Sequence, residues 1–94
     1  MKITLKINNE DKTFTAPFVS ARKLRKTLEV SEKVNKHGFN IEIFDEIVKF
    51  LVDLYGGQFT GDELMDGIDG NRLFEKALED MNYIIDGFGE EVKN

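Results

Sequence analysis

The sequence predicts an α+β domain in which an N-terminal antiparallel β-hairpin packs on a small, mainly α-helical body. Three observations predict this class. Residues 2–16 alternate polar and apolar side chains around a turn-forming cluster, which is typical of a hairpin. Residues 40–55 carry apolar side chains at helical spacing around most of the helix circumference, which indicates a central helix. The other segments combine helix caps with three- and four-residue apolar spacing, and so predict further helices.

The expected hairpin rests on the period-two pattern of its two strands. In the register that the pattern suggests, Ile7 pairs with Lys12 and Leu5 with Phe14, so the apolar side chains share one face. A two-stranded hairpin is not stable by itself in water. We therefore expect this face to rest on the helices.

The helix over about 40–55 is expected to form the centre of the core. Its apolar residues make two rows that merge, Phe44, Ile47, Val48, Leu51 and Tyr55 in the first and Ile43, Phe50 and Leu54 in the second. Polar residues are left only a narrow stripe, so this helix needs neighbours on two or three sides. An apolar row at this period indicates packing before it indicates a ligand site.

Two longer helices and a short one complete the expected domain, which spans residues 1–94. The first covers about 20–33, with Ser20 as its N-cap and an inner face of Ala21, Leu24 and Leu28, for which Val34 is a further candidate. A short connecting helix over about 61–66 opens with a capping box from Thr60 to Glu63. The last helix covers about 71–86 and ends at Gly87 or Gly89, before a polar tail at 90–94.

Composition places the chain among ordinary globular proteins. Of 94 residues, 40% are hydrophobic and 33% charged, and no apolar run approaches a membrane span. Without cysteine, the chain has no disulfide, thiolate metal site or cysteine nucleophile, and we expect a cytoplasmic protein. Charge is divided unevenly. Residues 1–37 hold nine Lys or Arg and four Asp or Glu, a net charge of +5. Residues 38–94 hold four Lys or Arg and fourteen Asp or Glu, a net charge of −10.

No pattern of catalytic or metal-binding residues is present in the sequence. His37 lies in a segment rich in lysine and glycine, without a neighbouring acid or nucleophile pattern. The acidic run from Asp62 to Asp69 fails the calcium-loop spacing, because Ile68 occupies the third position counted from Asp66. The glycines between 56 and 70 lack the Gly-Lys-Ser/Thr ending of a phosphate loop. We therefore predict a protein that is not an enzyme and has no cofactor and no metal.

A basic cluster is the feature that could indicate nucleic acid. It consists of Arg22, Lys23, Arg25 and Lys26. A small regulatory nucleic-acid-binding module is the alternative function that this cluster supports. The absence of interleaved aromatic residues and a pI near 4.8 oppose it. A solvated helix face, or contact with an acidic protein partner or with the chain's own acidic half, would also account for the cluster.

The order of these segments resembles a known family. MKITLKINNEDKTFTAPFVSARKLRKTLE, followed later by FLVDLYGGQFTGDELMDGID, is similar to the tail assembly chaperones of long-tailed bacteriophages and prophages from Gram-positive hosts. The resemblance covers the chain from Met1 to about Ile85. Its most specific parts are Lys12-Thr13-Phe14, the entry from Pro17 into the first helix, and Tyr55-Gly56-Gly57-Gln58-Phe59-Thr60.

The resemblance implies a non-catalytic role in virion assembly. Such a chaperone binds the tape measure protein, keeps it soluble and helps to recruit the major tail protein. A longer form made by ribosomal frameshifting is a further implied partner, and we expect a homo-oligomer without membrane contact. The complementary charges of the two halves suggest head-to-tail association. The candidate partner-binding residues are Phe18, Arg22, Lys23, Arg25, Lys26, Phe39, Phe59 and Phe88.

Overall fold

A hairpin followed by four helices makes up the fold. The computed structural model describes the backbone of residues 1–93 and the side chains of residues 1–87. The elements are β1 (Lys2–Ile7), β2 (Glu10–Thr15), α1 (Ala21–His37), α2 (Ile41–Leu54), α3 (Gly61–Gly67) and α4 (Gly70–Lys93). This order confirms the predicted α+β class.

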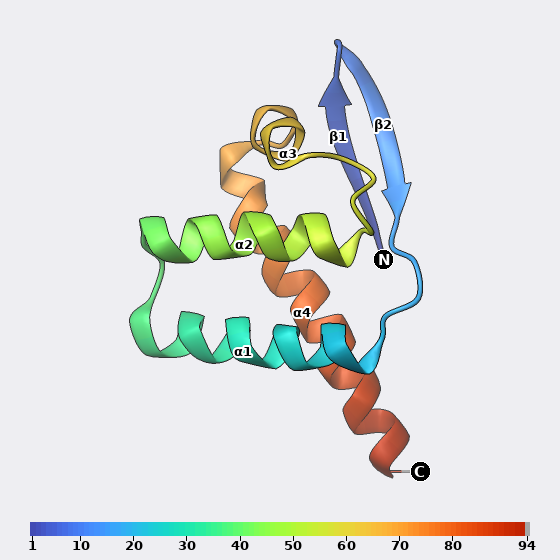
Figure 1. Cartoon of the computed structure of the whole chain (residues 1–94), viewed down its shortest axis with the longest axis vertical. Coiled ribbons are helices and arrows are strands. Elements are labelled where there is room, and N and C mark those ends of the chain that lie inside the picture. Colours follow the sequence, from blue (N-terminus) through green and yellow to red (C-terminus); the bar gives the residue numbers. More distant parts are fainter. Residues whose placement is uncertain (94) are drawn as a thin grey trace.

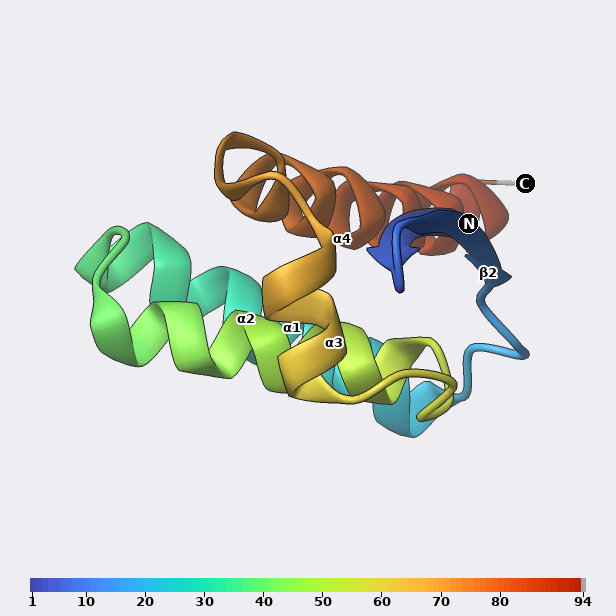
Figure 2. The same cartoon turned by 90° about the horizontal axis from the view of Figure 1, so that it is seen from above.

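The helices form two layers. Helices α1 and α2 lie side by side and run in opposite directions, and α4 crosses behind both of them (Figure 1). Seen from above, α4 lies on one side of the α1–α2 pair (Figure 2). The short α3 links α2 to α4 and packs against β1. The hairpin is therefore held near the end of α2, where the chain turns into α3 (Figure 1).

The hairpin closes through a tighter turn than its pattern suggested. Asn8 and Asn9 have φ values of 54° and 64°, which belong to the two-residue turns that match the twist of paired strands. Ile7 consequently pairs with Glu10, and the expected pairing of Ile7 with Lys12 is wrong by two residues. Because side chains alternate with period two, this shift keeps the same side chains on the same face.

Helix α2 is the centre of the core, as predicted. Its buried residues, with Tyr55 directly after it, are Ile43, Ile47, Val48, Phe50, Leu51, Leu54 and Tyr55, while Phe44 is half-buried. Helices α1, α3 and α4 all contact α2. Neighbours on several sides explain why so much of its circumference is apolar.

Helix α1 is one turn longer than predicted. Ser20 is its N-cap, as expected, and its Oγ accepts a hydrogen bond from the Lys23 backbone N–H at 3.3 Å. The helix continues through His37 and ends at Gly38, whose φ of 71° favours glycine. The predicted end at about residue 33 was wrong because residues 34–37 are compatible with a helix and Val34 packs against the core.

The inner face of α1 also differs from the prediction. Ala21 and Leu28 are exposed, whereas Thr27 and Val30 are fully buried. Thr27 can be buried because its hydroxyl donates to the backbone carbonyl of Lys23, at 2.7 Å. An apolar pattern search passes over a threonine that satisfies its own polar group in this way.

The last two helices begin as predicted, but α4 ends later. The capping box of α3 is present, with reciprocal hydrogen bonds of 2.9 and 3.1 Å between Thr60 and Glu63. Helix α4 extends to Lys93, past the predicted end at 86, and Gly87 lacks the positive φ that would end it. A single glycine costs a helix interior only about 1 kcal/mol. The predicted polar tail at 90–94 lies outside the residues whose side chains are described.

Candidate partner-binding surface

The charges of the basic cluster are largely used within the chain. The Nζ of Lys23 donates to the carbonyl oxygen of Leu54, at the end of α2, over 3.5 Å. Arg25 and Lys26 each lie 3.5 Å from Glu29 on the same helix. Three of the four cations therefore have internal partners. Because these side chains already contact groups of the same chain, they are less available to bind phosphate, which argues against the nucleic-acid alternative.

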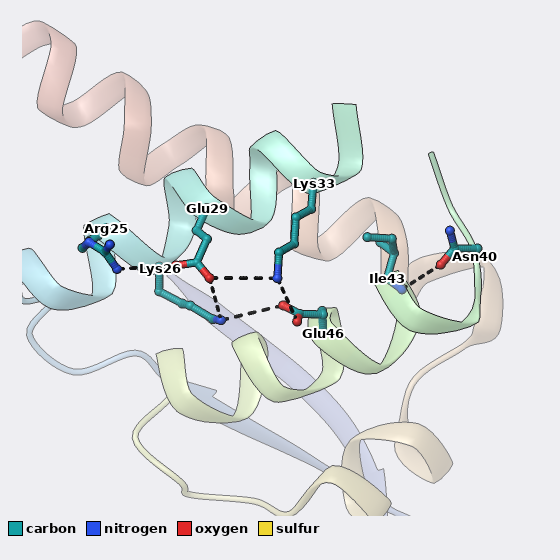
Figure 3. Close-up of polar contacts among 7 residues, drawn as sticks. All are labelled: Arg25, Lys26, Glu29, Lys33, Asn40, Ile43 and Glu46. Carbon is teal, nitrogen blue, oxygen red and sulfur yellow. Dashed lines mark hydrogen bonds and ion pairs between the residues drawn. The ribbon is translucent and has the colours of Figure 1, made fainter. Parts of the chain in front are cut away.

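Two of the lysines on α1 also reach across to α2. Glu46 accepts a hydrogen bond from Lys33 at 3.1 Å, and its second oxygen lies 3.7 Å from Lys26 (Figure 3). The hydrogen bond from Lys33 is the main reason why the pKa of Glu46 lies below its ordinary value. The network joins the basic first half of the chain to its acidic second half, so part of the charge asymmetry is neutralised inside one molecule.

An exposed aromatic surface lies where α1 connects to α2. Phe39 is 53% exposed, although its ring centre lies 4.3 Å from that of Phe74 and 6.5 Å from that of Phe44. Leu78 and Ile85 follow Phe74 on the same side of α4, at successive spacings of four and seven residues. We call Phe39, Phe74, Leu78 and Ile85 the Phe39 face. Each of these four side chains is at least partly accessible in the free chain.

The other candidate phenylalanines differ in accessibility. Phe18 is 85% exposed, in the segment between β2 and α1. Phe59 is only 2% exposed, with its ring centre 5.2 Å from that of Phe14 and 5.8 Å from that of Tyr55. The candidate residue Phe59 is therefore buried in the core of the free chain, because the turn after α2 folds this ring back against the hairpin. Phe88 lies outside the residues whose side chains are described.

A buried polar network is the feature that the sequence did not reveal. Asp80 on α4 is 2% exposed, and it accepts hydrogen bonds from Tyr55 at 2.7 Å and from Lys76 at 2.9 Å. Burial, and then the Asp80 carboxylate, raise the pKa of Tyr55. The four-residue spacing of Lys76 and Asp80 was the one visible signal, and it is shared by many exposed ion pairs. The network links α4 to the residue that directly follows α2.

Two surface grooves border α2. One, of about 590 Å³, is lined mainly by polar residues, among them Lys33, His37 and Glu46. The other, of about 460 Å³, is largely apolar, and we call it the glycine groove; it is lined by Val48, Lys49, Val52, Asp53, Gly56, Gly57 and Gly61.

Among the described residues, no group of three or more His, Cys, Asp or Glu is placed to hold a metal ion. In the same part of the chain, no helix is long and apolar enough to cross a membrane.

Comparison with known proteins identifies the family. A family described as phage tail chaperone protein matches residues 1–94, which is the whole chain. The chain belongs to the phage tail chaperone proteins. No curated protein and no solved structure matches it significantly. The prediction of a phage tail chaperone is thereby confirmed.

Membership of the phage tail chaperones gives the accessible residues a context. A chaperone acts by binding other proteins, which suggests partners among the phage tail proteins and a role without catalysis. Of the eight candidate residues, Phe18 and Phe39 are exposed apolar side chains. Arg22 is also exposed and has no ion-pair partner among the described residues. The chaperone thus presents aromatic side chains and one arginine, while its other candidate cations take part in contacts of its own.

Proposed function

We propose that this phage tail chaperone binds the tape measure protein, keeps it soluble and helps to recruit tail tube subunits around it. Family membership supports a role in tail assembly. The observation that carries the proposal further is the Phe39 face, where large apolar side chains remain accessible beside a well-filled core. The rings of Phe39 and Phe74 are in contact, and contiguous exposed apolar surface is typical of a protein-binding site.

The chemistry of the face suits a helical partner. A tape measure protein is expected to be long, helical and prone to aggregation, so it needs its apolar stripe covered before the tail forms. An apolar stripe on a helix can lie against exposed aromatic and aliphatic side chains, which bury it without any chemical step. Aromatic residues at the centre of such contacts commonly carry much of the binding energy. The net charge of −10 over residues 38–94 would help to keep the complex in solution.

Further partners and the place of assembly are proposed from the family resemblance alone. It includes the major tail protein and a longer, frameshifted form of the chain as additional partners. It also includes the cytoplasm of a Gram-positive host as the place of assembly. None of these partners requires a cofactor or a metal.

Co-expression with the tape measure protein of the same phage tests the proposal. Replacing Phe39 and Leu78 with serine should leave the chaperone folded but reduce the soluble tape measure protein recovered with it. A matched control is Tyr83→Ser, because Tyr83 is 67% exposed but lies on another side of α4. Circular dichroism of each purified variant verifies its fold. If the double variant solubilises and retains the tape measure protein as well as the control does, the Phe39 face is not the binding surface.

A further inference from the structure

Phe18 is held in an exposed position by its neighbours. Its side chain is 85% exposed, the highest value among the large apolar residues that the structure describes. The ring of Pro17 lies against Gly56, close enough that a Cβ there would be 3.1 Å from Pro17 Cγ. Val19 packs against the core on the other side, and Ser20 caps α1. With both neighbours anchored, the backbone presents the Phe18 side chain to solvent.

The glycine groove is an apolar hollow of suitable size for such a ring. Val48 and Val52 form one wall, one helical turn apart on α2, and glycines form much of the remainder. Gly61 packs closely on Val48, since a Cβ at Gly61 would lie only 3.3 Å from Val48 Cγ1. The groove measures about 460 Å³. The groove is open to solvent, so it can cover one side of a phenyl ring without enclosing it.

The charges beside the ring and beside the groove are opposite. Arg22 follows Phe18 by four residues, at the start of α1, and is exposed. Asp53 lines the groove and is also exposed. Neither has an ion-pair partner among the residues whose side chains are described. A chain that inserts Phe18 into the groove of another copy could bring these two free charges together.

We propose that Phe18 of one copy enters the glycine groove of a second copy, with Arg22 facing Asp53 across the contact. Because Pro17 lies against Gly56, the ring and the groove are neighbours on the surface, and each copy can give one contact and receive another. One ring buries less area than a stable dimer interface needs, so the association is weak and depends on concentration. If the tape measure protein is the partner, as proposed above, many such contacts would add up along its length.

Light scattering of the purified chain alone tests the contact, independently of any tape measure protein. In about 50 mM salt the mean mass of the wild type should rise as the protein approaches about 1 mM, and less so in about 500 mM salt. Phe18→Ala should remain at the monomer mass. Phe39→Ala is the matched control and should associate like the wild type, because Phe39 belongs to the other exposed surface.

A charge exchange between two variants gives the sharper test. Arg22→Glu and Asp53→Arg each place like charges across the proposed contact, so each should stay monomeric when measured separately. Mixed together they should associate, because the glutamate introduced in one variant would face the arginine introduced in the other. Both positions are exposed, and an acidic residue in the first turn of α1 favours the helix, so folding is preserved.

Three results would overturn the proposal. One is a wild type that remains monomeric throughout, which is also the outcome expected if the ring folds into its own groove. Another is a Phe18→Ala variant that associates as the wild type does. The third is a mixture of the two charge variants that associates no more than either variant separately.

Discussion

At the scale of single residues, the Tyr55 hydroxyl and the Asp80 carboxylate are the most constrained polar groups. Both residues are at most 2% exposed, and the hydroxyl is hydrogen-bonded to the carboxylate at 2.7 Å. A buried carboxylate is costly unless it is paired and hydrogen-bonded, and Lys76 supplies the opposite charge. The three side chains therefore act as one unit, in which the loss of one member leaves another unsatisfied.

Replacing Tyr55 with phenylalanine should destabilise the protein by about 1–3 kcal/mol, because Asp80 then loses a buried hydrogen-bond donor. Urea unfolding measures the difference. Tyr83→Phe is the control, since Tyr83 is 67% exposed and should lose almost nothing. A Tyr55→Phe variant as stable as this control would show that the hydrogen bond contributes little to folding.

The phenylalanines show what the sequence could and could not predict about the candidate surface. Phe18, Phe39 and Phe59 all lie at the ends of elements, outside the main apolar rows. The sequence alone therefore gave no reason to prefer one of them as a binding residue. Exposure of Phe59 depends on how the turn after α2 folds against the hairpin, which is a long-range contact. Apolar side chains of the core and of a binding surface have the same local signature.

At the scale of elements, the α1–α2 pair is joined by an ionic network as well as by apolar packing. Glu46 is placed between Lys26 and Lys33 of α1, and the hydrogen bond from Lys33 holds its pKa below the ordinary value of 4.5. A carboxylate whose pKa is lowered on folding stabilises the native state above the unfolded pKa. That contribution is lost as the pH falls through the folded value.

We therefore predict a pH-dependent difference between the wild type and Glu46→Gln. At neutral pH the variant should be less stable by up to about 1 kcal/mol, the usual limit for a partly exposed pair. The difference should shrink as the pH falls below about 4.5, because Glu46 of the wild type then takes up a proton. Chemical denaturation at a series of pH values measures it.

The control for this experiment is Asp45→Asn, on the same helix but past its first turn. Asp45 is exposed and has no ion pair among the described residues, so its replacement should have little effect at any pH. If Glu46→Gln lowers stability equally at pH values above and below 4.5, the loss comes from packing and not from the charge.

Elements were predictable where local rules decide them. Caps at Ser20 and Thr60 depend on a few adjacent residues, and both formed as predicted. The strand register was wrong by two residues because alternation fixes only which face a side chain takes, whereas the turn fixes the pairing. The buried side of α1 was predicted only in part: Leu24 packs against the core, but Thr27 was missed because its hydroxyl is satisfied by a local hydrogen bond.

At the scale of the whole molecule, burial is unevenly shared among the helices. Helix α2 places six residues in the core and is contacted by the other three helices, so it cannot open unless they separate from it. Helix α1 places only Thr27 and Val30 among the fully buried residues, and lies at one side of the α1–α2 layer. Its other contacts come from partly buried side chains such as Leu24 and Val34, from packing on α4, and from ion pairs with Glu46 that each stabilise only modestly.

This unequal burial predicts the order in which backbone amides exchange with solvent. Amides in the middle of α2, from Ile47 to Leu51, should exchange most slowly, since they open only when the whole domain unfolds. Amides of α1 should exchange faster, through a partial opening in which α1 leaves and the rest of the core stays. Hydrogen exchange followed by NMR in low denaturant measures both rates. The Glu46→Gln variant should raise the rates in α1 more than those in α2, because it removes one of the attachments of α1. Equal protection in both helices, affected equally by this substitution, would mean that α1 and α2 open together as one cooperative unit.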